Sequence, residues 1–396
     1  MNKRVIKIDS IFNFMYIFSY ILFIVIKVLQ NTLLVESLSS LFFSYSRYLI
    51  FINLAIIFIA KLANGMNKKN IQLKIIMIVL GIITYFLADN ADCFCVMMFV
   101  ALASDMDFKK IIKTSIITNI LMLLFVIICC MLGKLPDYIY THSSFLSFLP
   151  NEGHSLGFKY YSNAAFMILY ISIMILFLKS NKKTILFVLF INIISLVVFT
   201  AKLPFFICIF YVALLVYFSK NRNYKISKKI WISFPILCIL VSFFFSLIYN
   251  PQINLINGLN TLLNNRLKMG HFALENYGIS LFGQKIIFQG TYALTYGKNV
   301  DWDIGYFFID NDYLLLIITY GLFLSIIIMM IYCHSIKNTI ENKNYKLFIW
   351  TISTLIFAFV NSSLISIEFN PILLVFMSLY YSDKSVMTKE KKINGI

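Results

Sequence analysis

The sequence predicts an all-α, polytopic integral membrane protein, and three observations carry that prediction. The chain of 396 residues is 60% hydrophobic, with a mean hydropathy of +0.85, well beyond the composition of soluble globular domains. Most of its apolar runs are long enough to cross about 30 Å of hydrocarbon. Most of its 34 Lys and Arg residues gather in short segments that fall on one side of those runs. Because backbone polar groups within a bilayer must bond to one another, the runs are expected to be helices.

The apolar runs and the basic segments between them predict about twelve spans, with both termini in the cytoplasm. In chain order, the spans are expected at residues 11–29, 41–62, 75–88, 94–104, 116–132, 164–178, 185–200, 205–218, 230–249, 313–333, 347–365 and 371–381. The first run lacks a small-residue cleavage site, so it is interpreted as a retained span and not as a signal peptide. The third and fourth runs are short, and a re-entrant hairpin is the alternative for them. Residues 1–396 are therefore expected to form a single membrane domain.

The strongly basic charge balance reflects orientation in the membrane. A net charge of +17 in a soluble protein would suggest a nucleic-acid partner. Here Lys3, Arg4 and Lys7 precede the first span, and further lysine clusters recur between later spans. This distribution is the positive-inside bias of an integral membrane protein. We therefore expect contact with membrane lipid and no nucleic-acid partner.

Two predicted outer loops are large, residues 133–161 and residues 250–312. The second loop precedes the tenth span and is the longest stretch without a predicted span. Within it, Gly258 to Tyr277 has the 3.6-residue period of an amphipathic helix. Arg266 falls in the middle of the apolar face of this predicted helix. A charge in that place either extends its head to water or meets an anion, and both interpretations stay open.

Further polar residues are expected at or near the outer side. Lys202 lies in the short turn between the seventh and eighth spans, and Arg47 lies within the second span. Each of these cations either snorkels or contacts an anion. His154, in the first outer loop, is either a base or a solvated side chain. The stretch from Asp310 to Asp312 opens the tenth span, where capping of the helix is the simpler interpretation.

Common catalytic motifs are absent from the sequence. It contains no Walker loop, no H-E-x-x-H and no G-x-S-x-G pattern, which argues against nucleotide hydrolysis, zinc hydrolysis and Ser-His-Asp chemistry. The pairs Asp301 with Asp303 and Asp310 with Asp312 could hold a divalent cation, but solvated loops and helix caps are commoner settings for such pairs. No metal and no cofactor is expected. Outward cations without a metal motif suit a lipid-linked pyrophosphate, whose oxygens match the fork of an arginine.

Three segments, taken in order, carry a resemblance to a known family. The first is Ser155-Leu156-Gly157-Phe158 with Asn163-Ala164-Ala165, before a span. The second is Asn265-Arg266 followed by Ala273-Leu274, Tyr277 and Leu281-Phe282-Gly283. The third is Asp310-Asn311-Asp312-Tyr313-Leu314 followed by Tyr320-Gly321. Together with the span number and the late outer loop, they resemble the Wzy-like polysaccharide polymerases of Gram-positive capsule and exopolysaccharide clusters, over nearly the whole chain.

The resemblance implies a metal-independent glycosyltransferase, related to the O-antigen ligases, in the bacterial plasma membrane. Such an enzyme joins undecaprenyl-pyrophosphate-linked oligosaccharide repeat units at the outer face. The resemblance implies that Arg266, assisted by Lys202, holds the donor pyrophosphate, and that Asp310 or His154 accepts the proton of the acceptor hydroxyl. The further substrate-binding residues that it implies are Asn311, Tyr313 and Asn163. A chain-length regulator and a flippase are the implied protein partners.

A flippase or another transporter of lipid-linked oligosaccharide is the alternative function. It predicts internal repeats and interrupted helices with polar residues at mid-membrane depth, and neither is evident in the sequence. An outer-face acyltransferase would need a histidine or serine motif that the sequence does not contain. Deletion strains separate the first two functions: without a polymerase, single repeat units collect on the outer leaflet, and without a flippase they stay inside.

Overall fold

Most of the described chain is helical. The computed structural model describes residues 3–63, 71–141, 152–220, 227–288, 307–361 and 363–381. Its helices are α1 (Lys3–Gln30), α2 (Ser40–Ala63), α3 (Ile71–Ala88), α4 (Ala91–Leu102), α5 (Phe108–Met131), α6 (Tyr161–Leu178), α7 (Lys182–Phe199), α8 (Lys202–Lys220), α9 (Lys228–Leu247), α10 (Asn254–Leu262), α11 (Arg266–Tyr277), α12 (Asp312–Leu315), α13 (Leu322–Glu341), α14 (Tyr345–Phe357) and α15 (Ile372–Tyr381). Short 3-10 helices cover Leu33–Glu36 and Ala103–Asp105, and a π-helix covers Leu316–Tyr320. The prediction of an all-α protein is confirmed for these residues, apart from one antiparallel hairpin of β1 (Ile139–Thr141) and β2 (Glu152–His154).

Nine helices in the described ranges are long and apolar enough to cross a membrane. They are Ser10–Gln30, Ser40–Ala63, Ile71–Ala88, Phe108–Met131, Tyr161–Leu178, Lys182–Phe199, Lys202–Lys220, Lys228–Leu247 and Leu322–Glu341. Large apolar side chains on their surfaces, such as Phe14, Phe86 and Met131, are exposed. Contiguous apolar surface of this kind is favourable in contact with lipid and unfavourable in contact with water. The chain is therefore a multi-pass membrane protein.

The other three predicted spans are shorter helices. α4 has 12 residues, α14 has 13 and α15 has 10. At a rise of about 1.5 Å per residue, each is shorter than the roughly 30 Å of hydrocarbon. The total of twelve spans therefore stays a prediction. The orientation does so too, and the lysine-bearing segments 64–70, 221–226 and 382–396 lie outside the described residues.

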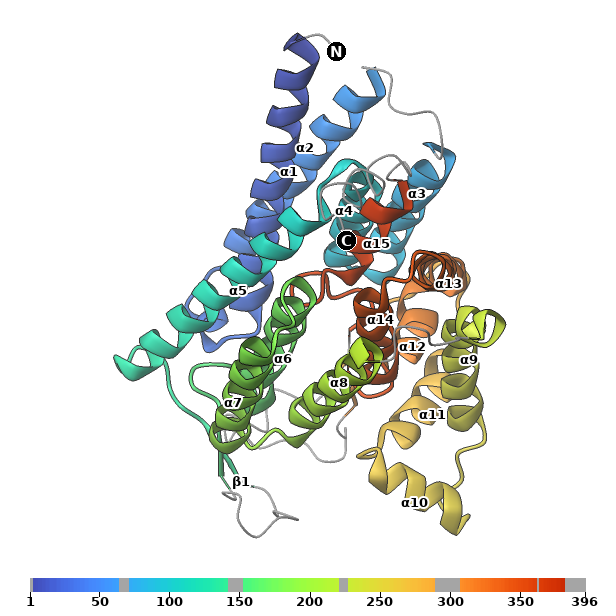
Figure 1. Cartoon of the computed structure of the whole chain (residues 1–396). Coiled ribbons are helices and arrows are strands. Elements are labelled where there is room, and N and C mark those ends of the chain that lie inside the picture. Colours follow the sequence, from blue (N-terminus) through green and yellow to red (C-terminus); the bar gives the residue numbers. More distant parts are fainter. Residues whose placement is uncertain are drawn as a thin grey trace.

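The C-terminal helices lie at the centre of the molecule. Figure 1 shows α12 to α15, in orange and red, between the N-terminal helices and the helices from α6 to α11. α15 contacts α4 and α5, α14 contacts α6 and α8, and α13 contacts α9. Among their side chains, Trp350 and Tyr332 are completely buried. Segments that the sequence separates widely therefore meet around these last helices.

The tenth predicted span is interrupted, so the prediction of one helix over 313–333 was wrong. α12 and the π-helix after it end at Tyr320, and α13 begins after Gly321. Gly321 has a φ of +90°, a conformation that residues with a side chain rarely adopt. Hydropathy records the length of an apolar run and not the continuity of its helix, which is why the sequence did not indicate the break.

A segment of the second outer loop docks on that break. Leu322 donates its N–H to Ser280 O at 3.0 Å. A Cβ on Gly321 would overlap the backbone of Gly283, so glycine permits the close approach. Two of the segments that carry the family resemblance, Leu281-Phe282-Gly283 and Tyr320-Gly321, therefore meet in space.

The chain between α14 and α15 is unwound. The eleventh predicted span reaches residue 365, whereas α14 already ends at Phe357. The unwound stretch buries Glu368, and the Tyr20 hydroxyl of α1 donates to Ile367 O at 2.7 Å. Irregular backbone is stable inside a membrane protein only where neighbouring groups satisfy it in this way.

The helix predicted over 258–277 is two helices, so the prediction of a single amphipathic helix was wrong. α10 ends at Leu262 and α11 begins at Arg266. Between them, Asn264 and Asn265 have φ values of +52° and +63°. Asparagine adopts this left-handed conformation more readily than other residues with a side chain. The break removes Arg266 from the face that a single helical wheel assigns to it and places it at the start of α11.

Candidate functional site

Arg266 forms an ion pair with Asp310. Its Nη2 atom lies 3.2 Å from Asp310 Oδ2, and its side chain is only 17% exposed. Its Nε donates to Val360 O at 3.1 Å, and its Nη1 donates to Leu263 O at 3.0 Å. The guanidinium therefore does not snorkel. It joins the turn between α10 and α11, the stretch before α12 and the unwound segment after α14.

The guanidinium keeps donors that the protein does not use. Arginine has five N–H groups. In Arg266, two of them make hydrogen bonds and at most one more faces Asp310. At least two N–H groups on the terminal nitrogens are thus left without a partner among the described residues. N–H groups on the two terminal nitrogens of a guanidinium can bind oxygens of a phosphate.

Burial and Arg266 act on Asp310 in opposite directions. Loss of hydration disfavours the ionised carboxylate and raises its pKa, whereas the positive charge of Arg266 lowers it. Burial has the larger effect, so the pKa of Asp310 lies above its ordinary value of 3.8. With 35% of its side chain exposed, the carboxylate stays within reach of a ligand. A raised pKa makes it a better proton acceptor than a fully hydrated carboxylate.

Asn311 and Tyr313 hold α12 in place. The Asn311 side-chain oxygen accepts the N–H of Tyr313 at 3.1 Å and that of Leu314 at 3.3 Å, which confirms the predicted helix cap. Asn311 Nδ2 donates to Ser242 Oγ of α9 at 3.1 Å. The Tyr313 hydroxyl donates to Leu355 O at 2.6 Å, and its ring is completely buried. Substrate binding by these two residues stays a prediction, and for Tyr313 it requires release of the ring.

Asp312 is a buried carboxylate that was not among the predicted site residues. Its Oδ2 accepts the N–H of Ser363 at 2.7 Å and that of Leu364 at 2.5 Å. Burial raises the pKa of Asp312 to about 6, although both hydrogen bonds lower it. Asp310 faces Arg266 and Asp312 faces the backbone of the unwound segment. The two carboxylates of this D-x-D pair therefore do not converge on one metal position.

The described part of the chain contains no group of three or more His, Cys, Asp or Glu side chains that could hold a metal ion. The other D-x-D pair, Asp301 with Asp303, lies outside the described residues. The expectation of a metal-independent reaction stays a prediction.

The first turn of α6 approaches the Arg266 site. The Tyr161 phenol lies within electrostatic range of the Arg266 guanidinium, and its ring packs against Tyr140 with the centroids 5.3 Å apart. Asn163, two residues later, donates to Asn31 O at 3.4 Å, beyond the end of α1. Tyr161, which the motifs did not single out, thus interacts with the charge of Arg266. The role of Asn163 in substrate binding stays a prediction.

His154 forms a dyad with Asp137, a residue that no sequence motif indicated. The Nδ1 atom of His154 lies 2.6 Å from Asp137 Oδ2, and Leu156 donates its N–H to Asp137 Oδ1 at 2.8 Å. The two residues are 17 positions apart, and pairing of β1 with β2 brings them together. Nδ1 is engaged, Nε2 has no partner among the described residues, and 39% of the side chain is exposed. A carboxylate that orients a histidine is a common arrangement of general bases.

Lys202, the first residue of α8, lies beside the strand that carries His154. A Cβ on Gly153 of β2 would overlap Thr200, which follows the last residue of α7 and lies two positions before Lys202. The Lys202 side chain makes no hydrogen bond or ion pair with the residues that the structure describes. Within the same ranges, nothing joins Lys202 or His154 to Arg266. The predicted approach of Lys202 to an anion held by Arg266 therefore stays a prediction.

The described residues thus form two groups: Arg266 with Asp310 and Tyr161, and His154 with Asp137 near Lys202. A cationic fork beside candidate proton acceptors provides the elements of a transfer reaction with an anionic leaving group. Comparison of this chain with protein-family models, with curated proteins and with solved structures finds no match.

Proposed function

We propose that this protein is a glycosyltransferase that polymerises oligosaccharide repeat units carried on undecaprenyl pyrophosphate. The product would be a capsular polysaccharide or exopolysaccharide at the outer face of the bacterial plasma membrane. The proposal is carried by the ion pair of Arg266 with Asp310 and by the unused N–H groups of its guanidinium. A pyrophosphate has more charge and more oxygens for these groups than one carboxylate has. The resemblance of the surrounding segments to Wzy-like polymerases supports the same assignment.

The proposed reaction is a substitution at the anomeric carbon of the donor sugar. The acceptor hydroxyl attacks this carbon, its O–H bond breaks, and the proton passes to a base of the protein. A new glycosidic bond forms while the bond from the carbon to the pyrophosphate oxygen breaks. Arg266 stabilises the charge that develops on the leaving pyrophosphate. One such contact in a site shielded from water contributes about 3 kcal/mol.

We assign the base to Asp310 in preference to His154. Asp310 adjoins the guanidinium that would hold the leaving group, and burial raises its pKa. Charge neutralisation and proton transfer would then occur at one place, as positioning requires. His154, oriented by Asp137, is the alternative base and otherwise a contact for the acceptor sugar.

The proposal is tested with the purified full chain in lipid nanodiscs and a synthetic undecaprenyl-pyrophosphate-linked repeat unit. The expected result is a ladder of longer glycans with release of undecaprenyl pyrophosphate, in the presence and in the absence of a chelator. Arg266→Ala should lower ladder formation about a hundredfold. Lys268→Ala, whose side chain is exposed two residues later, is the matched control and should give the full ladder. Folded parent protein that never joins two units would contradict the proposal.

Transport of lipid-linked oligosaccharide is a second candidate because the structure contains helix interruptions that the sequence did not indicate. The break at Gly321 and the unwound segment before α15 accompany the buried side chains of Asp312 and Glu368. Interrupted helices with buried polar groups are typical of secondary transporters. A deletion strain decides between the two: single repeat units on the outer leaflet indicate a polymerase, and units trapped inside indicate a flippase.

A further inference from the structure

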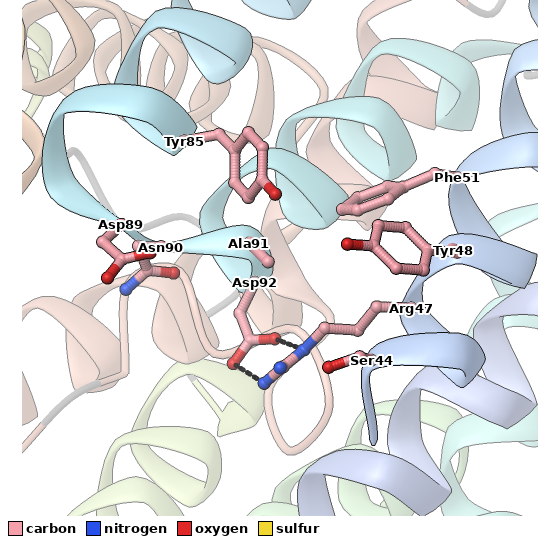
Figure 2. Close-up of a pocket in the computed structure, with 9 residues that line it drawn as sticks. All are labelled: Ser44, Arg47, Tyr48, Phe51, Tyr85, Asp89, Asn90, Ala91 and Asp92. Carbon is pink, nitrogen blue, oxygen red and sulfur yellow. Dashed lines mark hydrogen bonds and ion pairs between the residues drawn. The ribbon is translucent and has the colours of Figure 1, made fainter. Parts of the chain in front are cut away.

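A polar pocket of about 280 Å³ lies between α2, the turn after α3 and the start of α4. None of the residues assigned above lines it. Figure 2 shows its wall, to which Arg47, Tyr48, Tyr85, Asn90 and Asp92 contribute. The sequence singled out Arg47 as a cation within a span, and the proposed reaction does not use it.

Arg47 and Asp92 meet edge to edge in this pocket (Figure 2). Arg47 Nε lies 2.8 Å from Asp92 Oδ1, and its Nη2 lies 3.3 Å from Oδ2. Lys27 Nζ lies 2.8 Å from the same Oδ2 and also interacts electrostatically with the buried Glu368. The charged side chains that line the pocket are one cation, Arg47, and two carboxylates, Asp89 and Asp92. The cluster has no excess positive charge with which to select an anion.

The pocket offers hydrogen-bond donors and acceptors side by side. Arg47 Nη1 has no partner among the described residues, and neither have the hydroxyls of Tyr48 and Tyr85. A tyrosine hydroxyl both donates and accepts, guanidinium N–H groups donate, and the Asp92 carboxylate accepts. Sugar hydroxyls also both donate and accept hydrogen bonds, so a sugar can bond to the donors and to the acceptors of this pocket.

Three aromatic rings complete the wall: Tyr48, Phe51 and Tyr85 (Figure 2). Phe51 packs against Phe94 of α4 with the centroids 4.8 Å apart and against Tyr85 with the centroids 6.3 Å apart. The rings therefore support one another. An aromatic face is negative and apolar, so it attracts the C–H face of a pyranose ring. A phosphate would make no favourable contact with these aromatic faces, and an acyl chain would form no hydrogen bonds with the polar groups.

The rim of the pocket is joined to the second outer loop. Lys285 Nζ of that loop lies 2.6 Å from Asp89 Oδ2. Asn90 Nδ2 donates to the Tyr320 hydroxyl at 3.4 Å, and Tyr320 immediately precedes the helix break on which the loop docks. Two residues of the pocket rim, Asp89 and Asn90, are thus tied to the loop that carries Arg266 and to the helix break on which it docks.

We infer that the pocket between α2 and α4 is a carbohydrate-binding subsite that takes one uncharged sugar residue of a membrane-anchored glycan. Arg266 would bind the charged head of the lipid-linked substrate, and this subsite would bind a sugar of its repeat unit. Naming the glycan as a lipid-linked repeat unit rests on the proposed function. Binding of a sugar in the pocket does not depend on that function.

The test is saturation-transfer NMR on the purified full chain in nanodiscs. The probes are the methyl glycosides of glucose, galactose, N-acetylglucosamine and rhamnose, with inorganic pyrophosphate as an anion. At least one glycoside should receive saturation. Tyr85→Ala should weaken its apparent affinity roughly tenfold, and Tyr85→Phe, which keeps the ring, should weaken it less. Tyr45→Ala, at an exposed position of α2 outside the pocket, is the matched control and should change nothing.

A second pocket variant, Tyr48→Ala, replaces Tyr85→Ala if the latter does not fold. The subsite is overturned if no glycoside receives saturation, if the pocket variants bind as the parent does, or if pyrophosphate alone binds in a manner that needs Arg47. Arg266→Ala should bind the glycoside normally although it forms far less polymer. Glycoside binding by a parent protein that forms no polymer would contradict the proposed function alone, whereas polymer without glycoside binding would contradict the subsite alone.

Discussion

Two arginine–carboxylate pairs of this protein have the same chemistry and different geometry. Arg47 contacts Asp92 through two nitrogens, at 2.8 Å and 3.3 Å, and Lys27 adds a second cation to the same carboxylate. Arg266 reaches Asp310 through one nitrogen at 3.2 Å. The Asp92 side chain is 23% exposed and that of Asp310 is 35% exposed. One carboxylate is thus held by two cations, and the other by a single contact at a more open place.

This difference determines what each pair can do. A carboxylate shared by two cations has its charge neutralised and its position fixed, so the Arg47 pair presents fixed groups to a neutral ligand. Arg266 holds its carboxylate through one contact at a more exposed place, and Asp310 has a raised pKa. A pyrophosphate can therefore replace the carboxylate as the partner of Arg266 while Asp310 takes a proton. The partners of an arginine, more than its place on a helical wheel, indicate its role.

Asp310→Asn should cause the largest loss of polymer formation, because it removes the proton acceptor from the pair of Arg266 with Asp310. Loss of a general base lowers the rate roughly 10²- to 10⁴-fold. The amide has the same shape, and Arg266 keeps its two carbonyl contacts, so the yield of folded protein should not change. Polymer formation by the purified variant measures the effect.

The same assignment predicts the pH dependence of the parent enzyme. Burial raises the pKa of Asp310 above 3.8, so the carboxyl is protonated and inactive at a higher pH than an ordinary aspartate. As pH falls, activity should therefore be lost at pH values above 3.8. If the Asp310→Asn variant of the previous experiment shows near-normal chain growth, Asp310 is not the base and His154 becomes the candidate.

Arg266→Ala should lower polymer formation about a hundredfold, because one lost contact to a leaving group costs about 3 kcal/mol. Arg266→Lys keeps the charge but loses the fork, so it should restore activity only in part. Lys268→Ala is the control and should be nearly silent. Polymer length is compared at equal levels of each variant in the membrane. Equal polymer from Arg266→Lys and from the parent would rule out a pyrophosphate clamp.

Asp92→Asn should lower thermal stability, because two part-buried cations lose their shared counter-charge. The expected loss is about 2 kcal/mol, between the values for exposed and buried pairs. Asp89→Asn is the matched control: this carboxylate is exposed, pairs with the exposed Lys285 and with no other described residue, and should change stability little. Thermal unfolding of the purified proteins measures both. Equal shifts of the unfolding temperature in the two variants would show that the Asp92 ion pairs contribute no more to stability than a surface ion pair does.

Asp137→Asn and His154→Gln should have the smallest effects, about tenfold each on the initial rate, because the dyad lies apart from Arg266. If the dyad acts as one unit, the double variant should be no slower than either single variant. Initial rates of the three proteins form a double-mutant cycle. Losses that multiply to about a hundredfold in the double variant would show that the two residues act independently.

Local features of the structure could be predicted from the sequence. The apolar runs indicated the long helices, because a span needs only enough apolar length to match the hydrocarbon. Asn311 was recognised as a cap because capping involves residues two or three positions away. The breaks were missed for a related reason. The helix at Gly321 is interrupted where the backbone of the outer loop supplies hydrogen bonds to it. Arg266 does not lie on the predicted face because Asn264 and Asn265 adopt left-handed conformations that break the predicted helix.

Contacts between distant segments were decided only by the tertiary structure. Arg266 donates to Val360, 94 positions away, and His154 meets Asp137 only because two strands pair. Composition and periodicity place a residue on a helix or in a loop, but they do not indicate which distant segment that residue will contact. That choice depends on how all the helices pack against one another. Within a packed interior a polar group must have a partner, so the packing decides which carboxylate each arginine meets.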